Sequence, residues 1–428
     1  MSLRQLARDL LIAEVTVRLS IGRHKRSDRE DAGIMAQQQI KPTIPVSEYP
    51  ERWKKVQVLM DEQDLDFLVA YADDRATFGP AHARWLANFP VHFEPVCILM
   101  FRQGNPIMLT GPESDQYALL AGQIPDVRVL REFTHPNEDY PYSRIQSLAE
   151  IISEMGRDVK SLGRAGLAGR GLINGDLLHA LQSALPQLEW VDVENDLCDL
   201  RSQKSTSEIE IIRYAYRIAE AGFQAAVEAI QAGVTEREVA AEIDSAMRRA
   251  GSEGTGIDTI VASGPNTQPI LARSTFRRIE ANDLVLLTIA PRYEGYHAAI
   301  GRAVFVGDPG KAIRRALDVA IQAQQACSAA LRPGVEGREV EAIGRQIVEA
   351  ANLGQFFLYS GVHSVGVIEF EPPIFGPSSP AVLKKDMIIS IDIPMFNAPW
   401  GGLRVENGYL ITENSAEPLH QTPYHIQK

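Results

Sequence analysis

The sequence DLVLLTIAPRYEGYHAAIGRAVF, residues 283–305, decides the fold of this chain. Its LVLLTI segment is apolar at five of six positions and on both of its faces, which is typical of a strand buried in the middle of a sheet. A Glu-Gly pair then supplies a turn. We expect a second strand over residues 296–306, antiparallel to the first.

A second copy of this pattern lies about a hundred residues further along the chain. KDMIISIDIP at 385–394 matches NDLVLLTIAP at 282–291, an offset of 385 − 282 = 103. PGVEGREVEAIG at 333–344 matches AGVTEREVAAEI at 232–243, an offset of 333 − 232 = 101. Two matches at nearly one offset predict an internal duplication of a helix-helix-strand-strand unit, folded as two halves around a pseudo-two-fold axis. We expect a ligand site in the cleft between the halves.

The composition is that of a globular protein with more than one core. The chain has 428 residues, of which 45% are hydrophobic and 23% charged, so two domains are expected. A net charge of −12 argues against nucleic acid or an anionic membrane as a partner. The three cysteines, Cys97, Cys198 and Cys327, are odd in number and have no CxxC spacing, which favours reduced thiols in a cytoplasmic protein.

The sequence divides into three parts. Residues 1–44 form an N-terminal arm with interrupting arginines and no signal-peptide pattern, so we favour an added arm over a targeting segment; packing on a second subunit is an alternative. Residues 45–200 alternate helical and strand patterns, which predicts an α/β domain. Residues 201–428 carry the duplicated unit. No apolar run approaches the roughly 20 residues that span a bilayer.

Three groups capable of acid/base chemistry are expected to converge in the cleft. His363 lies among small residues in GVHSVG, Asp392 interrupts an apolar strand, and Glu406 follows in GGLRVENGYLIT. A buried carboxylate needs a partner, and carboxylates beside a histidine orient its ring and raise its pKa. Structural pairing of Asp392 with Arg302 or Arg404 is the alternative interpretation.

These motifs together resemble the creatinase, aminopeptidase P and prolidase superfamily. The resemblance covers roughly residues 45–420 and is carried by RSQKSTSEIEIIRYAYRIAEAGF, AGVTEREVAAEI, EGYHAAIGRAVF, DMIISIDIP and GGLRVENGYLITEN. It implies a creatinase-like N-terminal α/β domain followed by an α/β catalytic domain of the pita-bread fold. It also implies a homodimer in which the partner's N-terminal domain helps to close the site.

The resemblance implies a pair of divalent cations held by Asp, Asp, His, Glu and Glu in the peptidases of this family. The corresponding positions here are Thr288, Ala299, His363, Asp392 and Glu406. Because the first two offer no carboxylate, we expect the dinuclear site to be lost and no metal or other cofactor to be needed. A single residual metal on the other three groups is the alternative. The chain is therefore placed nearest the metal-free creatinase-like branch.

The chain also departs from creatinase itself. The acid/base histidine implied by the resemblance falls on Leu271, the guanidinium-binding glutamate on Gly301, and a second histidine on Phe370. Creatine is therefore not expected as the substrate.

His297 is a further candidate for proton transfer. Period two places His297, Ala299 and Gly301 on one face of the expected second strand. We expect His297 or His363 to carry the proton; a strand histidine satisfied by the backbone is the alternative for His297. The catalytic candidates are thus His363, Asp392, Glu406 and His297. The substrate-binding candidates are Arg302, Arg404, Phe93, His92, Tyr296 and Phe370.

The function expected from these observations is a metal-independent, creatinase-like hydrolase. It would cut an amide or amidine C–N bond of a small polar substrate by histidine-based acid/base catalysis. Three alternatives stay open: a catalytically inactive binding homologue, a lyase, and a metallopeptidase for Xaa-Pro peptides on the same fold.

Overall fold

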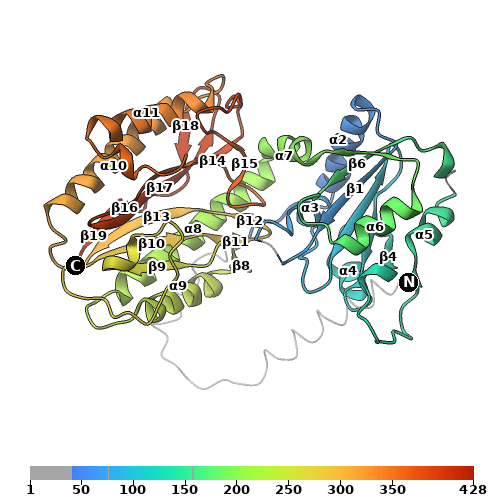
Figure 1. Cartoon of the computed structure of the whole chain (residues 1–428), viewed down its shortest axis with the longest axis horizontal. Helices are drawn as coiled ribbons and strands as arrows, with labels where there is room; N and C mark the ends of the chain where they lie inside the picture. Colours follow the sequence, from blue (N-terminus) through green and yellow to red (C-terminus); the bar gives the residue numbers. More distant parts are fainter. Residues whose placement is uncertain (1–40, 76, 157–158) are drawn as a thin grey trace, which may run out of the picture. The chain divides into compact units, whose positions relative to one another are not determined.

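The computed structural model describes residues 41–428 with the exception of 76, 157 and 158. The expected N-terminal arm over residues 1–44 lies almost entirely outside the described residues. The described chain forms a seven-stranded and a nine-stranded sheet, each covered by helices, together with a small three-stranded sheet (Figure 1). The prediction of an α/β fold with a duplicated second half is confirmed.

The first sheet has the strand order β5-β4-β3-β2-β1-β6-β7. Its two central pairs, β1 with β2 and β2 with β3, are antiparallel, and its outer pairs are parallel. The strands are β1 Phe67–Ala72, β2 Val96–Phe101, β3 Ile107–Thr110, β4 Val127–Leu130, β5 Ile145–Gln146, β6 Arg164–Ala168 and β7 Glu189–Asp192.

Six helices accompany this sheet and the segment that follows it. The central strands β1, β2 and β3 are buried at every position, because helices and loops cover both of their faces. The helices are α2 Glu48–Glu62, α3 Ala81–Ala87, α4 Asp115–Ala121, α5 Leu148–Glu154, α6 Gly175–Ala184 and α7 Glu194–Ser202.

The nine-stranded sheet shows the predicted duplication directly. Its main path is β15-β14-β16-β17-β13-β10-β9, so β14-β16-β17 mirrors β9-β10-β13 about the β17–β13 pair. Two further strands pair with the central strands outside this path, β18 with β17 and β19 with β13. The strands are β9 Ile260–Ser263, β10 Leu284–Ile289, β13 Ile300–Phe305, β14 Val362–Ser364, β15 Glu371–Ile374, β16 Ile388–Ala398, β17 Gly401–Ile411, β18 Ala416–Pro418 and β19 His425–Gln427.

Each half of this sheet has its own pair of antiparallel helices. In Figure 1 the α8–α9 pair lies over the half with β9 and β10, and the α10–α11 pair lies over the half with β16 and β17. Apolar side chains on the inner stripe of each helix form the core with the sheet. The helices are α8 Thr206–Ala229, α9 Glu236–Ala250, α10 Lys311–Ala330 and α11 Gly337–Ala350.

Capping residues fix where two of these helices begin. Thr235 and Glu238 form the capping box of α9, and Gly251 ends that helix with a φ of 113°. Two Ser-x-x-Glu patterns overlap at the start of α8, and the first of them, Ser205 with Glu208, forms its capping box.

The expected second strand of the opening motif is divided in two. Glu294 and Gly295 form the predicted turn, both with positive φ. After it, β12 (Tyr296–His297) pairs with β11 (Pro291–Tyr293), which pairs with β8 (Gly254–Thr255) in the three-stranded sheet. The nine-stranded sheet resumes at β13, two residues later. The side-chain alternation therefore does not run continuously from His297 to Gly301.

The described part of the chain contains no helix that is both long and apolar enough to cross a membrane. The three cysteines are free and buried, as the sequence predicts.

Candidate active site

A cavity of about 270 Å³ opens on the nine-stranded sheet and contains three of the four predicted catalytic residues. Its lining combines polar and ionisable side chains (the polar wall) with apolar side chains (the apolar wall), and the two meet where the ring of Phe370 packs on that of His363. The polar wall consists of Tyr359, His363, Glu369, Asp392, Arg404 and Glu406. The apolar wall consists of Phe78, Ile257, Ile270, Leu271 and Phe370.

The strand register brings the polar wall together. Asp392 of β16 lies opposite Glu406 of β17, which lies opposite Gly301 of β13, which lies opposite Thr288 of β10. Directly opposed residues of neighbouring strands point to the same side of a sheet, so these four form one row across both halves. His363 of β14 lies opposite Ser390, two residues along from Asp392, and so shares the face of this row.

His363 is buried, and its two ring nitrogens have different partners. Nδ1 lies 2.9 Å from the carbonyl oxygen of Ser364, which can only accept, so Nδ1 carries a proton. Nε2 faces the cavity, 3.7 Å from Oε1 of Glu406. Burial alone would lower the pKa of His363, but the neighbouring carboxylates of Glu406 and Glu369 outweigh it and the pKa is raised.

Glu406 and Asp392 are both buried, but their environments push their pKa values apart. Ser390 Oγ donates a hydrogen bond of 2.9 Å to Oε1 of Glu406. Burial would raise the pKa of Glu406, yet His363 and Arg404 outweigh burial, and the pKa is lowered. Burial, together with the negative charge of Glu406, raises the pKa of Asp392 to about 6.

Asp392 already has two partners of its own. The hydroxyl of Tyr359 donates a short hydrogen bond to Oδ2, and Nε of Arg404 lies 3.8 Å from the same oxygen. Its other oxygen, Oδ1, is buried without a hydrogen-bond partner among the described residues. Tyr359 was not predicted from the sequence; its position four residues before His363 is the one signal that could have indicated it.

Glu369 is the second residue of the site that the sequence prediction missed. Its side chain lies in the cavity with His363 and Glu406, and the residue is 6% exposed. Burial and the charge of Glu406 raise its pKa to about 7. The available signal was an acidic residue within the apolar run VGVIEF that follows His363.

The two arginines proposed for substrate binding lie in different places. Arg404 lines the cavity, and Gly301 makes room for it: a Cβ on that glycine would lie 2.7 Å from Cγ of Arg404. Of the guanidinium nitrogens of Arg404, Nη2 donates to the carbonyl of Ile270. Arg302 points away from the cavity and anchors the backbone, donating to carbonyls of Pro423, Gly301, Glu406 and Thr422 and to the side chain of Asn407.

The remaining predicted residues, apart from Phe370, do not line this cavity. Nδ1 of His297 donates to the carbonyl of Gly366, since that oxygen can only accept, and burial lowers its pKa to about 3. The hydroxyl of Tyr296 donates to Glu208 over 2.6 Å. His92 and Phe93 lie on an exposed loop, where His92 pairs with Asp74. Phe370 does line the cavity, with its ring 4.3 Å from that of His363.

The donor set of the cavity does not fit two cations but does fit one. Thr288 and Ala299 are buried and offer a hydroxyl and a methyl group where a dinuclear site needs carboxylates. His363, Glu369 and Glu406 each offer a ligand atom, and these atoms lie within 4.8 Å of one another. Three protein ligands around an open position are typical of a catalytic metal site.

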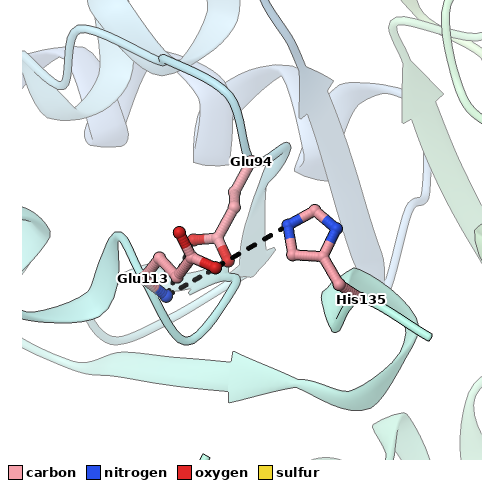
Figure 2. Close-up of side chains that lie close together, drawn as sticks. All are labelled: Glu94, Glu113 and His135. Carbon is pink, nitrogen blue, oxygen red and sulfur yellow. Dashed lines mark hydrogen bonds and ion pairs between the residues drawn. The ribbon is translucent and has the colours of Figure 1, made fainter. Parts of the chain in front are cut away.

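A second cluster of possible ligands lies beside the first sheet, away from the cavity. Figure 2 shows Glu94, Glu113 and His135 facing one another. The buried carboxylate of Glu94 accepts backbone N–H groups of Glu113 and Ser114 over 2.7–3.1 Å, at the start of α4. Both other side chains are partly exposed. This cluster is explained as the anchor of the loop before α4.

Comparisons with known proteins identify the family. A model of metallopeptidase family M24 matches residues 210–413, and a model of the creatinase/prolidase N-terminal domain matches residues 52–203. The Xaa-Pro dipeptidase of Pyrococcus furiosus is 30% identical over 334 residues, which cover 77% of this chain and 92% of that protein. The Xaa-Pro dipeptidase of Pyrococcus horikoshii is 29% identical over 332 residues, 76% of this chain and 92% of that protein.

Solved structures agree with this assignment. The prolidase from Pyrococcus furiosus matches with a TM-score of 0.72 at 26% identity, over 86% of this chain and 99% of that chain. An X-Pro aminopeptidase from Thermotoga maritima matches with a TM-score of 0.74 at 21% identity, over 88% of this chain and 99% of that chain, which shows the fold alone.

These relatives correct the function expected from the sequence. A metal-independent, creatinase-like hydrolase of non-peptide C–N bonds is contradicted, because the curated relatives that cover most of the chain are Xaa-Pro dipeptidases of a metallopeptidase family. The expectation of metal independence rested on Thr288 and Ala299 in place of two aspartates, with a single residual metal as the alternative. The chain belongs to metallopeptidase family M24, with a creatinase/prolidase N-terminal domain ahead of the pita-bread domain.

Proposed function

We propose that this protein is a hydrolase of small peptides of the Xaa-Pro type, which acts in the cavity on the nine-stranded sheet. The observation that carries the proposal is 30% identity to an Xaa-Pro dipeptidase over 92% of that protein's length. The buried cavity with a histidine, three carboxylates and an arginine supports it. A volume of about 270 Å³ suits a dipeptide-sized substrate rather than a folded protein.

The two walls of the cavity give it a polarity that suits such a substrate. Ile270, Leu271 and Phe370 offer apolar surface to a ring or aliphatic side chain. The polar wall offers hydrogen-bond donors and acceptors to the amide bond. A substrate bound between them would be oriented with its scissile bond towards the carboxylates.

A cation in this cavity would be held by His363, Glu369 and Glu406. When bound, a divalent cation polarises a carbonyl group and lowers the pKa of water. The chain itself supplies the acceptor for a proton: Oδ1 of Asp392 has no partner, and the pKa of about 6 leaves this carboxylate mostly ionised at neutral pH.

Tyr359 and Arg404 orient that acceptor. Both approach Oδ2 of Asp392, so they fix the carboxylate with Oδ1 left over. Burial keeps the pKa of Tyr359 well above its ordinary value, so the phenol retains its proton as a donor. The remaining N–H groups of Arg404 are available to a carbonyl or carboxylate oxygen of the substrate.

The test is the hydrolysis of a dipeptide panel. Ala-Pro, Gly-Pro, Ala-Ala and Pro-Ala are incubated with the full chain in buffer containing Mn²⁺, and released amino acids are quantified by chromatography. Release of proline from the Xaa-Pro members is expected. His363→Ala and Glu406→Gln should abolish it, whereas the matched control His179→Ala, on α6 outside the cavity, should not.

Absence of cleavage for every dipeptide, with the protein folded and Mn²⁺ present, would overturn the proposal and favour an inactive homologue or a lyase. Assembly as a homodimer remains a prediction, which light scattering of the purified chain tests.

A further inference from the structure

Glu369 presents a carboxylate that the protein leaves without a hydrogen-bond donor. The residue is 6% exposed, and none of the described residues donates a hydrogen bond to it. Buried carboxylates are normally hydrogen-bonded or paired with a cation, because an isolated buried charge is costly. Its neighbour Glu406 is also an acid, with a ligand atom within 4.8 Å, so the two carboxylates repel each other unless a proton or a cation lies between them.

The neighbours of Glu369 are themselves arranged as ligands. His363 donates from Nδ1 to the backbone, which directs Nε2 into the cavity, where the neutral ring offers a lone pair. A hydrogen bond from the outer nitrogen to a carbonyl is the usual way in which a metal-binding histidine is oriented. Ser390 fixes one oxygen of Glu406. One imidazole and two carboxylates suit a divalent ion such as Mn²⁺ or Zn²⁺.

Asp392 is not among the three residues whose ligand atoms lie within 4.8 Å of one another. Tyr359 and Arg404 approach its Oδ2, and its Oδ1 is left as the proton acceptor of the proposed reaction. Thr288 and Ala299 offer no carboxylate. The carboxylates that would complete a second cation site at those two positions are therefore missing.

The segment that carries Glu369 is held rigidly from both ends. On one side, His297 donates both its backbone N–H and Nδ1–H to the carbonyl of Gly366, over 2.9 and 3.1 Å. On the other, Glu371 accepts from Arg201 at 2.9 Å and from Lys204 at 3.0 Å, and all three side chains are buried. Fixed flanking residues define the position of Glu369, as a metal ligand requires.

From this juxtaposition we infer that each chain binds one divalent cation, on His363, Glu369 and Glu406, and that Glu369 replaces the missing aspartates as the third ligand. The inference rests on the proposed function only in that both place a cation in this cavity. It does not depend on which amide is cut.

The experiment counts cations on the full chain. The protein is stripped with chelator, dialysed against Mn²⁺, and analysed by mass spectrometry of the metal and by electron paramagnetic resonance of the free Mn²⁺. One Mn²⁺ per chain is expected. Glu369→Gln should weaken binding at least tenfold, since even residues behind the ligands change affinity by about that factor. Asp392→Asn and His135→Ala, which alters the cluster of Figure 2, should retain one Mn²⁺.

Two cations per chain, or none at millimolar Mn²⁺, would overturn the inference. So would a Glu369→Gln variant that binds as tightly as the unaltered chain, or an Asp392→Asn variant that loses as much affinity as Glu369→Gln. Circular dichroism of each cation-free variant establishes that it is folded. One bound Mn²⁺ without cleavage of any Xaa-Pro dipeptide would refute the proposed function and leave the inferred cation site intact. Cleavage of an Xaa-Pro dipeptide with two bound cations would refute the single-cation site and leave the proposed function intact.

Discussion

Replacing Glu369 by glutamine should stabilise the cation-free protein in a pH-dependent way. Burial and the charge of Glu406 raise the pKa of Glu369 from its ordinary value of 4.5 to about 7. In the unfolded chain the carboxyl ionises at the ordinary value. The ionised group therefore destabilises the folded state by about 3 kcal/mol at pH 8 and about 1 kcal/mol at pH 5. Glutamine has no such charge.

The direction of the change in the free energy of unfolding with pH depends on whether the folded or the unfolded state holds the proton. Between pH 4.5 and 7 the folded protein retains a proton that the unfolded chain has lost, so the free energy of unfolding falls as the pH rises through this window. The advantage of Glu369→Gln over the unaltered chain should therefore grow by about 2 kcal/mol from pH 5 to pH 8. Urea denaturation with chelator present, followed by circular dichroism at both pH values, measures it.

Added Mn²⁺ provides the internal control for this prediction. A cation that binds the folded state stabilises the unaltered chain by mass action and should reverse the ranking of the two proteins at pH 8. An advantage of Glu369→Gln that does not change between pH 5 and pH 8 would refute the reasoning, because it would mean that Glu369 is not an uncompensated buried charge.

Other perturbations test the surroundings of the site. Glu371→Gln leaves Arg201 and Lys204 without their buried anion. It should lower the free energy of unfolding by about 3–5 kcal/mol, measured by urea denaturation. Burial, together with the nearby guanidinium of Arg302, lowers the pKa of His420 to about 3. Lowering the pH from 7 to 5 should therefore reduce the free energy of unfolding by about 2 kcal/mol more in the unaltered chain than in His420→Gln. Tyr359→Phe should lower kcat for a cleaved dipeptide roughly tenfold with KM nearly unchanged, because the donor to the catalytic carboxylate is lost.

The duplicated fold was predictable because local hydrophobic periodicity determines the helices and strands of each half. Two apolar runs at one offset, each following a pair of amphipathic helices, are enough to predict two matching halves of one sheet. The prediction of one continuous strand over residues 296–306 was wrong. Nothing in the sequence HAAIG indicates that the chain leaves one sheet after His297 and joins another at Ile300. That break depends on pairing with β11, a tertiary contact, and it removes His297 from the cavity.

Alternation within a strand would have separated the two arginines. Arg404 lies two residues before Glu406 and so shares its face, whereas Arg302 follows Gly301 and lies on the other face. Side-chain alternation therefore favours Arg404 over Arg302 as a residue that faces the cavity. The contacts of Arg302 with backbone carbonyls confirm its structural position.

Glu369 and Tyr359 could not be predicted in the same way. Both lie outside regular strands, in the loops on either side of β14. Their side-chain directions are set by loop conformation and by anchors distant in sequence, Arg201 among them. The metal-independent interpretation rested on Thr288 and Ala299 alone, because the sequence gives no indication that Glu369 lies beside His363 and Glu406.

The most direct test of this account is an anomalous diffraction experiment on crystals grown with Mn²⁺. We expect one anomalous peak per chain, in contact with His363 Nε2 and with the carboxylates of Glu369 and Glu406. Two neighbouring peaks reaching towards Thr288, or a cavity with no peak in which His363 bonds Glu406 directly, would contradict it.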